Sequence, residues 1–147
     1  MSAEDVVRGL WKSLSARDWN AVKTHLSDDC IYADMPVGAA LAARGPEDIV
    51  KRLKVGLEPL AGYENHDGML VDNGSDVFYE HSETWRWQTG ETALLRFVTV
   101  HRVEDGKITL WKDYWDMSGL TATAPPTWMD ELMTADTSWV FDATGMI

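Results

Sequence analysis

A change in hydrophobic periodicity after Leu57 limits the folds open to this chain most strongly. Before it, apolar residues recur at helical spacing and predict three helices, which begin near Ser2, Asp18 and Gly45-Pro46. One short strand is expected over residues 30–37. After the change, apolar and polar residues alternate and predict four strands, over residues 67–71, 77–88, 92–103 and 107–117. This order is typical of an α+β domain, a cone in which helices pack on one side of a curved, mixed and mostly antiparallel sheet.

The length of 147 residues suits a single domain over residues 1–147, with its core over roughly residues 3–122 and a C-terminal tail over 123–147. Pro125-Pro126 is expected to end the sheet, and Thr127 to start a last helical turn. The tail carries six large apolar side chains: Trp128, Met129, Leu132, Met133, Trp139 and Phe141. A loose tail would not carry so many, so we expect a symmetric homodimer formed through the outer sheet face and the tail.

The net charge of -11 excludes several classes of partner, because an acidic surface repels nucleic-acid phosphates and anionic lipids. Cys30 is the only cysteine, so the sequence predicts no intrachain disulfide and no metal site built from thiolates. The acidic N-terminus and the lack of a long apolar run predict neither a signal peptide nor a membrane-spanning helix. These features together favour a cytoplasmic protein.

Two predicted strands place charged side chains on a face that a sheet would bury. In the second of the four strands the odd-numbered positions form the more apolar face: Val77, Tyr79, His81, Glu83, Trp85 and Trp87. In the last strand, one face carries Trp111, Asp113, Trp115 and Met117. We expect His81, Glu83 and Asp113 to lie together on the buried face of the curved sheet.

Asp113, between two tryptophans, is the strongest chemical signal in the chain. Burial raises the pKa of a carboxyl group toward the range useful for acid or base catalysis. An ion pair, for example with His81, is the structural alternative. With Glu83 on the same surface, proton transfer is the favoured interpretation. A metal site built from these three residues is not expected without further histidines or cysteines.

The other three histidines carry weaker signals. His25 lies near a predicted helix end, where it can interact with the helix dipole. His66 and His101 are expected at the surface.

Three segments resemble a known family: Tyr32-Ala33-Asp34-Met35-Pro36, Tyr79-Glu80-His81-Ser82-Glu83, and residues 106–116, which include Trp111-Lys112-Asp113-Tyr114-Trp115. The order of elements over residues 3–122 resembles the nuclear-transport-factor-2-like (NTF2-like) superfamily. Within it the chain is similar to limonene-1,2-epoxide hydrolases.

The resemblance implies a role for each matching residue. Tyr32 and Asp34, the latter in place of the family's Asn, would hold a water that Asp113 activates as general base. Glu83, in place of an Asp, would protonate the epoxide oxygen. His81, in place of an Arg, would link the acids, and we expect it to be protonated. With three carboxyl groups close together, at least one should be neutral at pH 7.

The expected substrate is small and hydrophobic, and neither a cofactor nor a metal is required. Its pocket should be lined by Trp85, Leu95, Phe97, Trp111, Trp115 and Met117. Two alternatives stay open. One is a cofactor-free isomerase, dehydratase or cyclase of the ketosteroid-isomerase or SnoaL-like polyketide-cyclase kind, in which Asp113 or His81 abstracts a carbon-bound proton. The other is a non-catalytic binding module.

Overall fold

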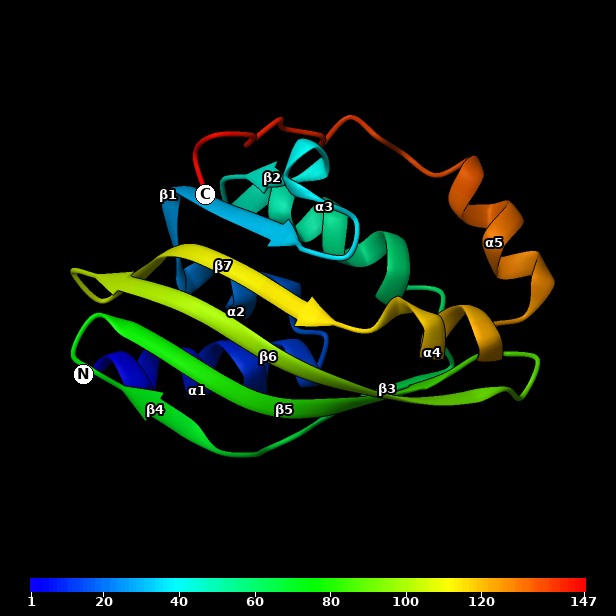
Figure 1. Cartoon of the computed structure of the whole chain (residues 1–147), viewed down its shortest axis with the longest axis horizontal. Coiled ribbons are helices and arrows are strands. Elements are labelled where there is room, and N and C mark those ends of the chain that lie inside the picture. The colour runs from blue at the N-terminus through cyan, green and yellow to red at the C-terminus, as the bar shows by residue number, and fades with distance from the viewer.

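The computed structural model describes residues 1–147 and contains five α-helices and seven strands (Figure 1). The helices are α1 (Ala3–Ser15), α2 (Trp19–Thr24), α3 (Pro46–Leu57), α4 (Met117–Thr123) and α5 (Pro126–Met133). The strands are β1 (Leu26–Asp34), β2 (Ala43–Arg44), β3 (Gly62–His66), β4 (Leu70–Asp72), β5 (Asp76–Arg86), β6 (Thr92–Glu104) and β7 (Lys107–Trp115). A 3-10 turn, η1, covers Ala39–Leu41.

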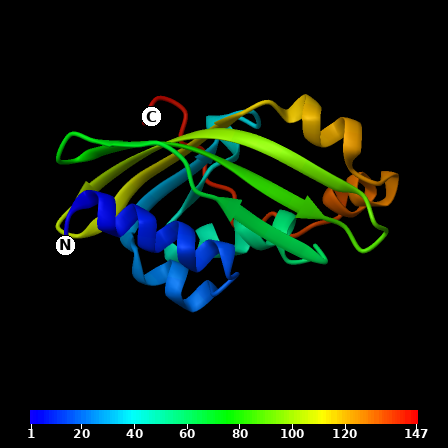
Figure 2. The same ribbon diagram turned by 90° about the horizontal axis from the view of Figure 1, so that it is seen from below.

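All strands belong to one sheet in the order β2-β1-β7-β6-β5-β3, with β4 paired to β5 beside β3. Every pairing is antiparallel except that of β1 with β7, which is parallel. The sheet is curved and unclosed, and Figure 2 shows α1, α2 and α3 on one side of it. The predicted α+β class and mostly antiparallel sheet are therefore confirmed.

The three N-terminal helices form where their caps and apolar stripes predict them. Ser2 and Asp5 form a reciprocal capping box at the start of α1, and Asp18 accepts a hydrogen bond from the backbone of Ala21 at the start of α2. The predicted apolar face of α1 is buried: Val6, Val7, Leu10, Trp11 and Leu14. This face packs into the main core between the helices and the sheet.

The strands differ from the prediction at several places. β1 covers Leu26–Asp34 rather than residues 30–37, because the backbone of Val37 and Gly38 turns back to donate to Asp34, and β4 covers Leu70–Asp72 rather than 67–71. β3 was not predicted, because Tyr63 is the only large apolar side chain in its five residues. β2 was also missed and is only two residues long. β7 ends at Trp115 rather than at residue 117, because Asp116 caps the next helix by accepting a hydrogen bond from Ser118.

The segment after β7 folds back over the open end of the sheet. It contains α4 and α5, and the second of these begins at the double proline where a helical turn was expected. Beyond α5 the chain returns along α3, and Phe141 pairs with Ala42 through backbone hydrogen bonds (Figure 1). No helix in the structure combines the length and the apolar character needed to cross a membrane.

Candidate active site

A small cavity of about 50 Å³, the inner chamber, lies between helices α1 and α3 and the helix-covered face of the sheet. Three carboxyl groups from three strands line it, and each is at least nine-tenths buried: Asp34 on β1, Glu83 on β5 and Asp113 on β7. The parallel pairing of β1 with β7 places Asp34 directly beside Asp113. The structure therefore brings together all three acids that the sequence singled out.

Asp113 is held at both of its carboxyl oxygens. The hydroxyl of Tyr32 donates to Oδ2 over 3.1 Å, and the indole N–H of Trp111 donates to Oδ1 over 2.9 Å. The hydroxyl of Thr99 also contacts Oδ1, at 2.8 Å. Burial, followed by the nearby charge of Asp34, raises the pKa of Asp113 to about 7 in spite of these contacts. Asp113 is thus suited to gain and lose a proton near neutral pH.

Glu83 has a pKa that is higher still. Its carboxyl group accepts a hydrogen bond from the hydroxyl of Tyr63 and another, at 3.1 Å, from the indole N–H of Trp85. Burial raises the pKa of Glu83, the two donors lower it, the charge of Asp113 adds to the rise, and the net value is about 8. Glu83 therefore keeps its proton to a higher pH than Asp113 does. Two carboxyl groups with separated pKa values are the usual basis of an acid and base pair.

Asp34 differs from the other two acids because a cation contacts it. Nη2 of Arg52, on α3, lies 3.0 Å from Oδ2 of Asp34, and the indole N–H of Trp115 donates to Oδ1. Burial raises the pKa of Asp34, while the charge of Arg52 acts in the opposite direction. Arg52 also lies over the ring of Trp139 from the C-terminal tail, 5.2 Å from its centroid.

His81 does not link the acids, which differs from the expectation. Its Nδ1 contacts Oδ1 of Asn65 and its Nε2 contacts Oγ1 of Thr99, both at 2.7 Å. The ring stacks on Tyr79 and lies close to Trp11. Burial lowers the pKa of His81 to about 3, so the expected imidazolium is replaced by a neutral ring. The physical reason is that no carboxylate contacts either nitrogen.

The remaining histidines also lie away from the inner chamber. The prediction that His101 is a surface residue is wrong, because it is fully buried and accepts a hydrogen bond from Trp11. Its apolar neighbours on the inner face of β6 explain this position. His66 is partly buried against Thr84, and His25 lies after α2 against α1. No set of three His, Cys, Asp or Glu side chains is arranged to hold a metal ion.

A second cavity of about 110 Å³, the outer chamber, adjoins the first and is mostly apolar. The two chambers share Asp34, Arg52, Gly56, Trp85 and Trp115. Helices α4 and α5 enclose the outer chamber with Met117, Leu120, Thr121, Trp128, Met129 and Leu132. The shared residues therefore form the boundary between an acidic inner end and an apolar outer end.

Four of the six side chains predicted to bind substrate line these chambers. Trp85 and Trp115 line both, Phe97 lines the inner one, and Met117 lines the outer one from the first turn of α4. Leu95 and Trp111 are buried outside both linings, which differs from the prediction. Trp111 instead contacts Asp113, as described above.

Three residues of the site were missed by sequence reasoning: Arg52, Tyr63 and Thr99. A signal existed for Arg52, because it lies three residues after the buried Ile49 and four before Gly56, on the side of α3 that faces the sheet. Thr99 shares the inner face of β6 with Phe97. Tyr63 belongs to the strand that was not predicted.

Solved structures with the same architecture define the class of fold. An LEH-like epoxide hydrolase of Mycobacterium tuberculosis has a TM-score of 0.67 at 21% identity, and the match covers 89% of each chain. A ketosteroid isomerase-like protein of Catenulispora acidiphila has a TM-score of 0.73 at 17% identity, covering 96% of this chain and 100% of that one. A putative SnoaL-like polyketide cyclase of Shewanella putrefaciens reaches 0.72 at 14% identity over 81% and 93%. The fold is therefore of the NTF2-like and ketosteroid isomerase-like kind.

The family is narrower than the fold. Residues 1–125 match the family described as the limonene-1,2-epoxide hydrolase catalytic domain, and the chain belongs to that family. Epoxide hydrolase EphG of M. tuberculosis is 25% identical over 115 residues, which cover 76% of this chain and 71% of EphG. The resemblance inferred from the three segments is thus confirmed.

Proposed function

We propose that the protein hydrolyses a small hydrophobic epoxide by adding water in one step, without a covalent intermediate. The observation that carries this proposal is the pair of buried acids in one chamber, of which Glu83 holds its proton to a higher pH than Asp113. Membership of the limonene-1,2-epoxide hydrolase family supports it.

In this mechanism the Asp113 carboxylate removes a proton from water while the water oxygen attacks an epoxide carbon. The carbon–oxygen bond of the ring breaks, and Glu83 gives its proton to the epoxide oxygen, so that a vicinal diol forms. Asp113 then holds the extra proton and Glu83 is ionised, and transfer of one proton restores the starting state. Tyr32 and Asp34 are placed beside Asp113 and would position the water.

Arg52 supplies the positive charge of the chamber in this proposal. In a water-excluded site that holds three acids a negative charge is costly, and one remains on the acid pair throughout the step, because Glu83 ionises as Asp113 takes up a proton. The guanidinium at Asp34 offsets part of that negative charge. It thereby stabilises the transition state as well as Asp34.

The two chambers suggest how the substrate would lie. The inner chamber has room for water and the epoxide ring, and the outer chamber offers apolar surface from Trp85, Trp115 and Leu120. The shape favours a substrate whose epoxide is at one end and whose hydrocarbon part is at the other.

The test is a single turnover with small apolar epoxides in water enriched in oxygen-18. The expected product is a diol that carries one labelled oxygen from the first turnover, with no label in the protein. If a covalent ester formed, the first diol would contain unlabelled oxygen from a carboxylate, and the label would appear in that side chain later. Either this labelling or a lack of turnover across the panel would contradict the proposal.

A second candidate is proton transfer at carbon, as in a ketosteroid isomerase or a polyketide cyclase. The observation that favours it is the geometry of Glu83, a neutral acid supported by Tyr63, which could donate a hydrogen bond to an enolate oxygen while Asp113 acts as base. Deuterium exchange into a cyclic ketone without epoxide hydrolysis would favour this candidate.

A further inference from the structure

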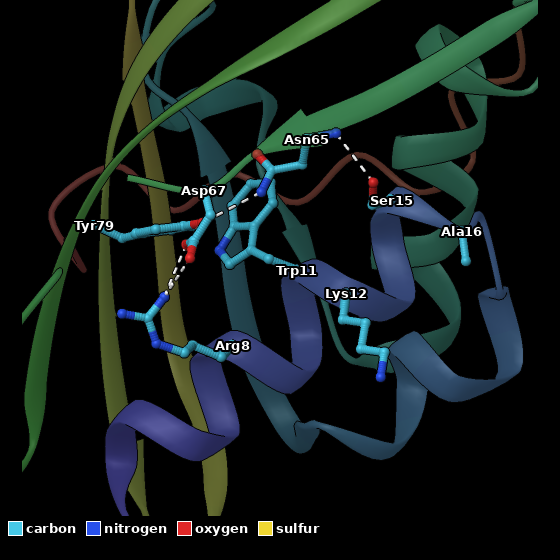
Figure 3. A pocket seen from close by; sticks show the side chains of 8 residues that line it. All are labelled: Arg8, Trp11, Lys12, Ser15, Ala16, Asn65, Asp67 and Tyr79. Atoms are coloured by element: carbon cyan, nitrogen blue, oxygen red, sulfur yellow. Dashed lines mark hydrogen bonds and ion pairs between the residues drawn. The ribbon is translucent and has the colours of Figure 1, made fainter. Parts of the chain in front are cut away.

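A continuous chain of hydrogen bonds runs from Asp113 to the surface, away from the inner chamber. Its five contacts are Asp113 Oδ1 to Thr99 Oγ1 (2.8 Å), Thr99 Oγ1 to His81 Nε2 (2.7 Å), His81 Nδ1 to Asn65 Oδ1 (2.7 Å), Asn65 Nδ2 to Tyr79 Oη (3.3 Å) and Tyr79 Oη to Asp67 Oδ1 (2.5 Å). The outer end lies in an open cleft of about 490 Å³ beside α1 (Figure 3). Neither the pair of acids nor the match to the family explains this chain of hydrogen bonds.

The outer end of the chain fixes the direction of its hydrogens. Asp67 is exposed and Arg8 contacts both of its oxygens, at 2.8 and 3.0 Å (Figure 3). The hydrogen bond from Tyr79 and the charge of Arg8 lower the pKa of Asp67, so Asp67 is ionised and can only accept. Tyr79 must therefore donate its single hydrogen to Asp67. The Tyr79 oxygen can then only accept, and this orients the N–H of Asn65 toward it.

The assignment of donors and acceptors continues from Asn65 toward Asp113. With its amide nitrogen at Tyr79, Asn65 presents its oxygen to Nδ1 of His81, so this nitrogen must carry a hydrogen. Burial keeps His81 neutral, which leaves its Nε2 without a hydrogen. Thr99 then donates its only hydrogen to Nε2. The 2.8 Å contact between Thr99 and Asp113 is satisfied only if the carboxyl group of Asp113 supplies the hydrogen.

We propose that Asp67, at the surface, sets the direction of every hydrogen in this chain and thereby favours the protonated form of Asp113. Thr99, His81, Asn65 and Tyr79 are positioning residues in this device. This proposal rests on the proposed function in one respect, namely that Asp113 is the general base. The chain of hydrogen bonds would make Asp113 a stronger base.

Other ionisable groups also affect the chain of hydrogen bonds, and the variants used in the test leave these groups unchanged. Those that share the inner chamber with Asp113 are Tyr32 and Asp34 on β1, Arg52 on α3, Tyr63 on β3 and Glu83 on β5. Near His81, the neutral His101 on β6 contacts Trp11 of α1. None of them contacts Asn65, Tyr79 or the hydroxyl of Thr99 through a side-chain hydrogen bond, so substitutions at those positions test the chain itself.

Two NMR measurements test the proposal without any substrate. Nitrogen-15 shifts of His81 at pH 7 should show the hydrogen on Nδ1 in the unmodified protein. Carbon-13 shifts of the Asp113 carboxyl group give its pKa. Tyr79→Phe removes the fixed end of the chain, so Asn65 can turn over, His81 can carry its hydrogen on Nε2, and Thr99 can donate to the Asp113 carboxylate. We expect the pKa of Asp113 to fall by about one pH unit.

The control variants separate the chain from general effects. Tyr114→Phe removes a hydroxyl next to Asp113 in sequence but on the opposite face of β7, and should leave the pKa of Asp113 unchanged. In a Thr99→Val background, where the chain is cut, Tyr79→Phe should have no effect on that pKa. A hydrogen on Nε2 in the unmodified protein would overturn the proposal. An unchanged or raised pKa in Tyr79→Phe, or a fall that persists without Thr99, would also overturn it. These outcomes do not depend on epoxide turnover. A failure of this proposal can therefore be distinguished from a failure of the proposed function.

Discussion

Arg52 on α3 and Asp34 on β1 form an ion pair over 3.0 Å, and this pair supplies the positive charge beside the acids. The sequence places His81 at the position where the resemblance implies an arginine, but His81 contacts Asn65 and Thr99 instead. The positively charged side chain of the site is therefore supplied by a helix that covers the sheet, and not by the strand that carries Glu83.

Replacing Arg52 with Gln should lower stability in a way that depends on pH. Without the guanidinium, Asp34 must either stay ionised while buried or take up a proton, and the second option becomes more costly as pH rises. We expect a loss of about 1 kcal/mol at pH 5 and about 3 kcal/mol at pH 8, measured by urea unfolding. Lys51→Gln, which removes an exposed neighbour that pairs with Asp48 at 3.7 Å, is the matched control and should change stability little. Equal losses at both pH values would contradict this account.

Asp113→Asn should abolish most of the activity and leave the fold intact. The amide has nearly the same shape but cannot accept a proton, so we expect kcat on the true substrate to fall about a hundredfold or more. Thermal unfolding at pH 8 should not become easier, because the variant removes a buried charge. Asp105→Asn, in an exposed turn with φ 51°, is the control. Full activity in Asp113→Asn would exclude Asp113 as the base.

The free energy of unfolding should fall between pH 6.5 and 8. The folded protein keeps protons on Asp113 and Glu83 up to about pH 7 and 8, whereas the unfolded chain releases them near pH 4, so stability decreases as pH rises. Below pH 6.5, burial of neutral His81 and His101, whose pKa values are lowered to about 3 and about 4, acts in the opposite direction and offsets this loss.

The expected net fall from pH 6.5 to 8 is about 2 kcal/mol. Glu83→Gln should remove most of it, because Glu83 has the higher pKa of the two acids. Denaturant titrations at a series of pH values would measure both quantities. A flat profile over this range in the unmodified protein would mean that the two acids ionise in the folded state as freely as in the unfolded chain.

The outer face of the sheet carries exposed apolar side chains that fit the predicted homodimer. Phe78, Val98 and Tyr114 lie on this face on three adjacent strands, and Val98 is paired directly with Tyr114. We expect light scattering to give roughly twice the chain mass of 16.5 kDa. Val98→Glu should shift the mass toward that of one chain, whereas Thr92→Glu, at the start of β6, should not. A mass of one chain for the unmodified protein at micromolar concentration would exclude this dimer.

Alternation along β5 and β7 was enough to predict which charged residues the sheet buries. Glu83 and Asp113 follow the two-residue period of their strands, so their orientation was fixed once the strands were assigned. The helix-forming pattern of α1 was equally clear. Local periodicity thus predicted the fold class and two of the three acids, whereas Asp34 was identified only through the resemblance to the family.

Contacts between distant segments could not be predicted in this way. The partner of His81 depends on β3, whose five residues lack a strand pattern and acquire their structure by pairing with β5. Without β3, Asn65 had no known position, and His81 was assigned to the acids because it shares the buried face of its strand with Glu83 and matches the arginine position of the family. The buried position of His101 likewise depends on Trp11, 90 residues away.

The roof of the outer chamber has a consequence for how this enzyme family can diversify. The family match ends at residue 125, and α5, which supplies Trp128, Met129 and Leu132 to the roof, begins at Pro126. The acids all belong to the sheet. Under the proposed function, an exchange of the last 22 residues would reshape this part of the space for a hydrocarbon group and leave Asp34, Glu83 and Asp113 on the sheet. The wall of the same chamber that Trp85, Trp115 and Met117 form would keep its sequence in such an exchange.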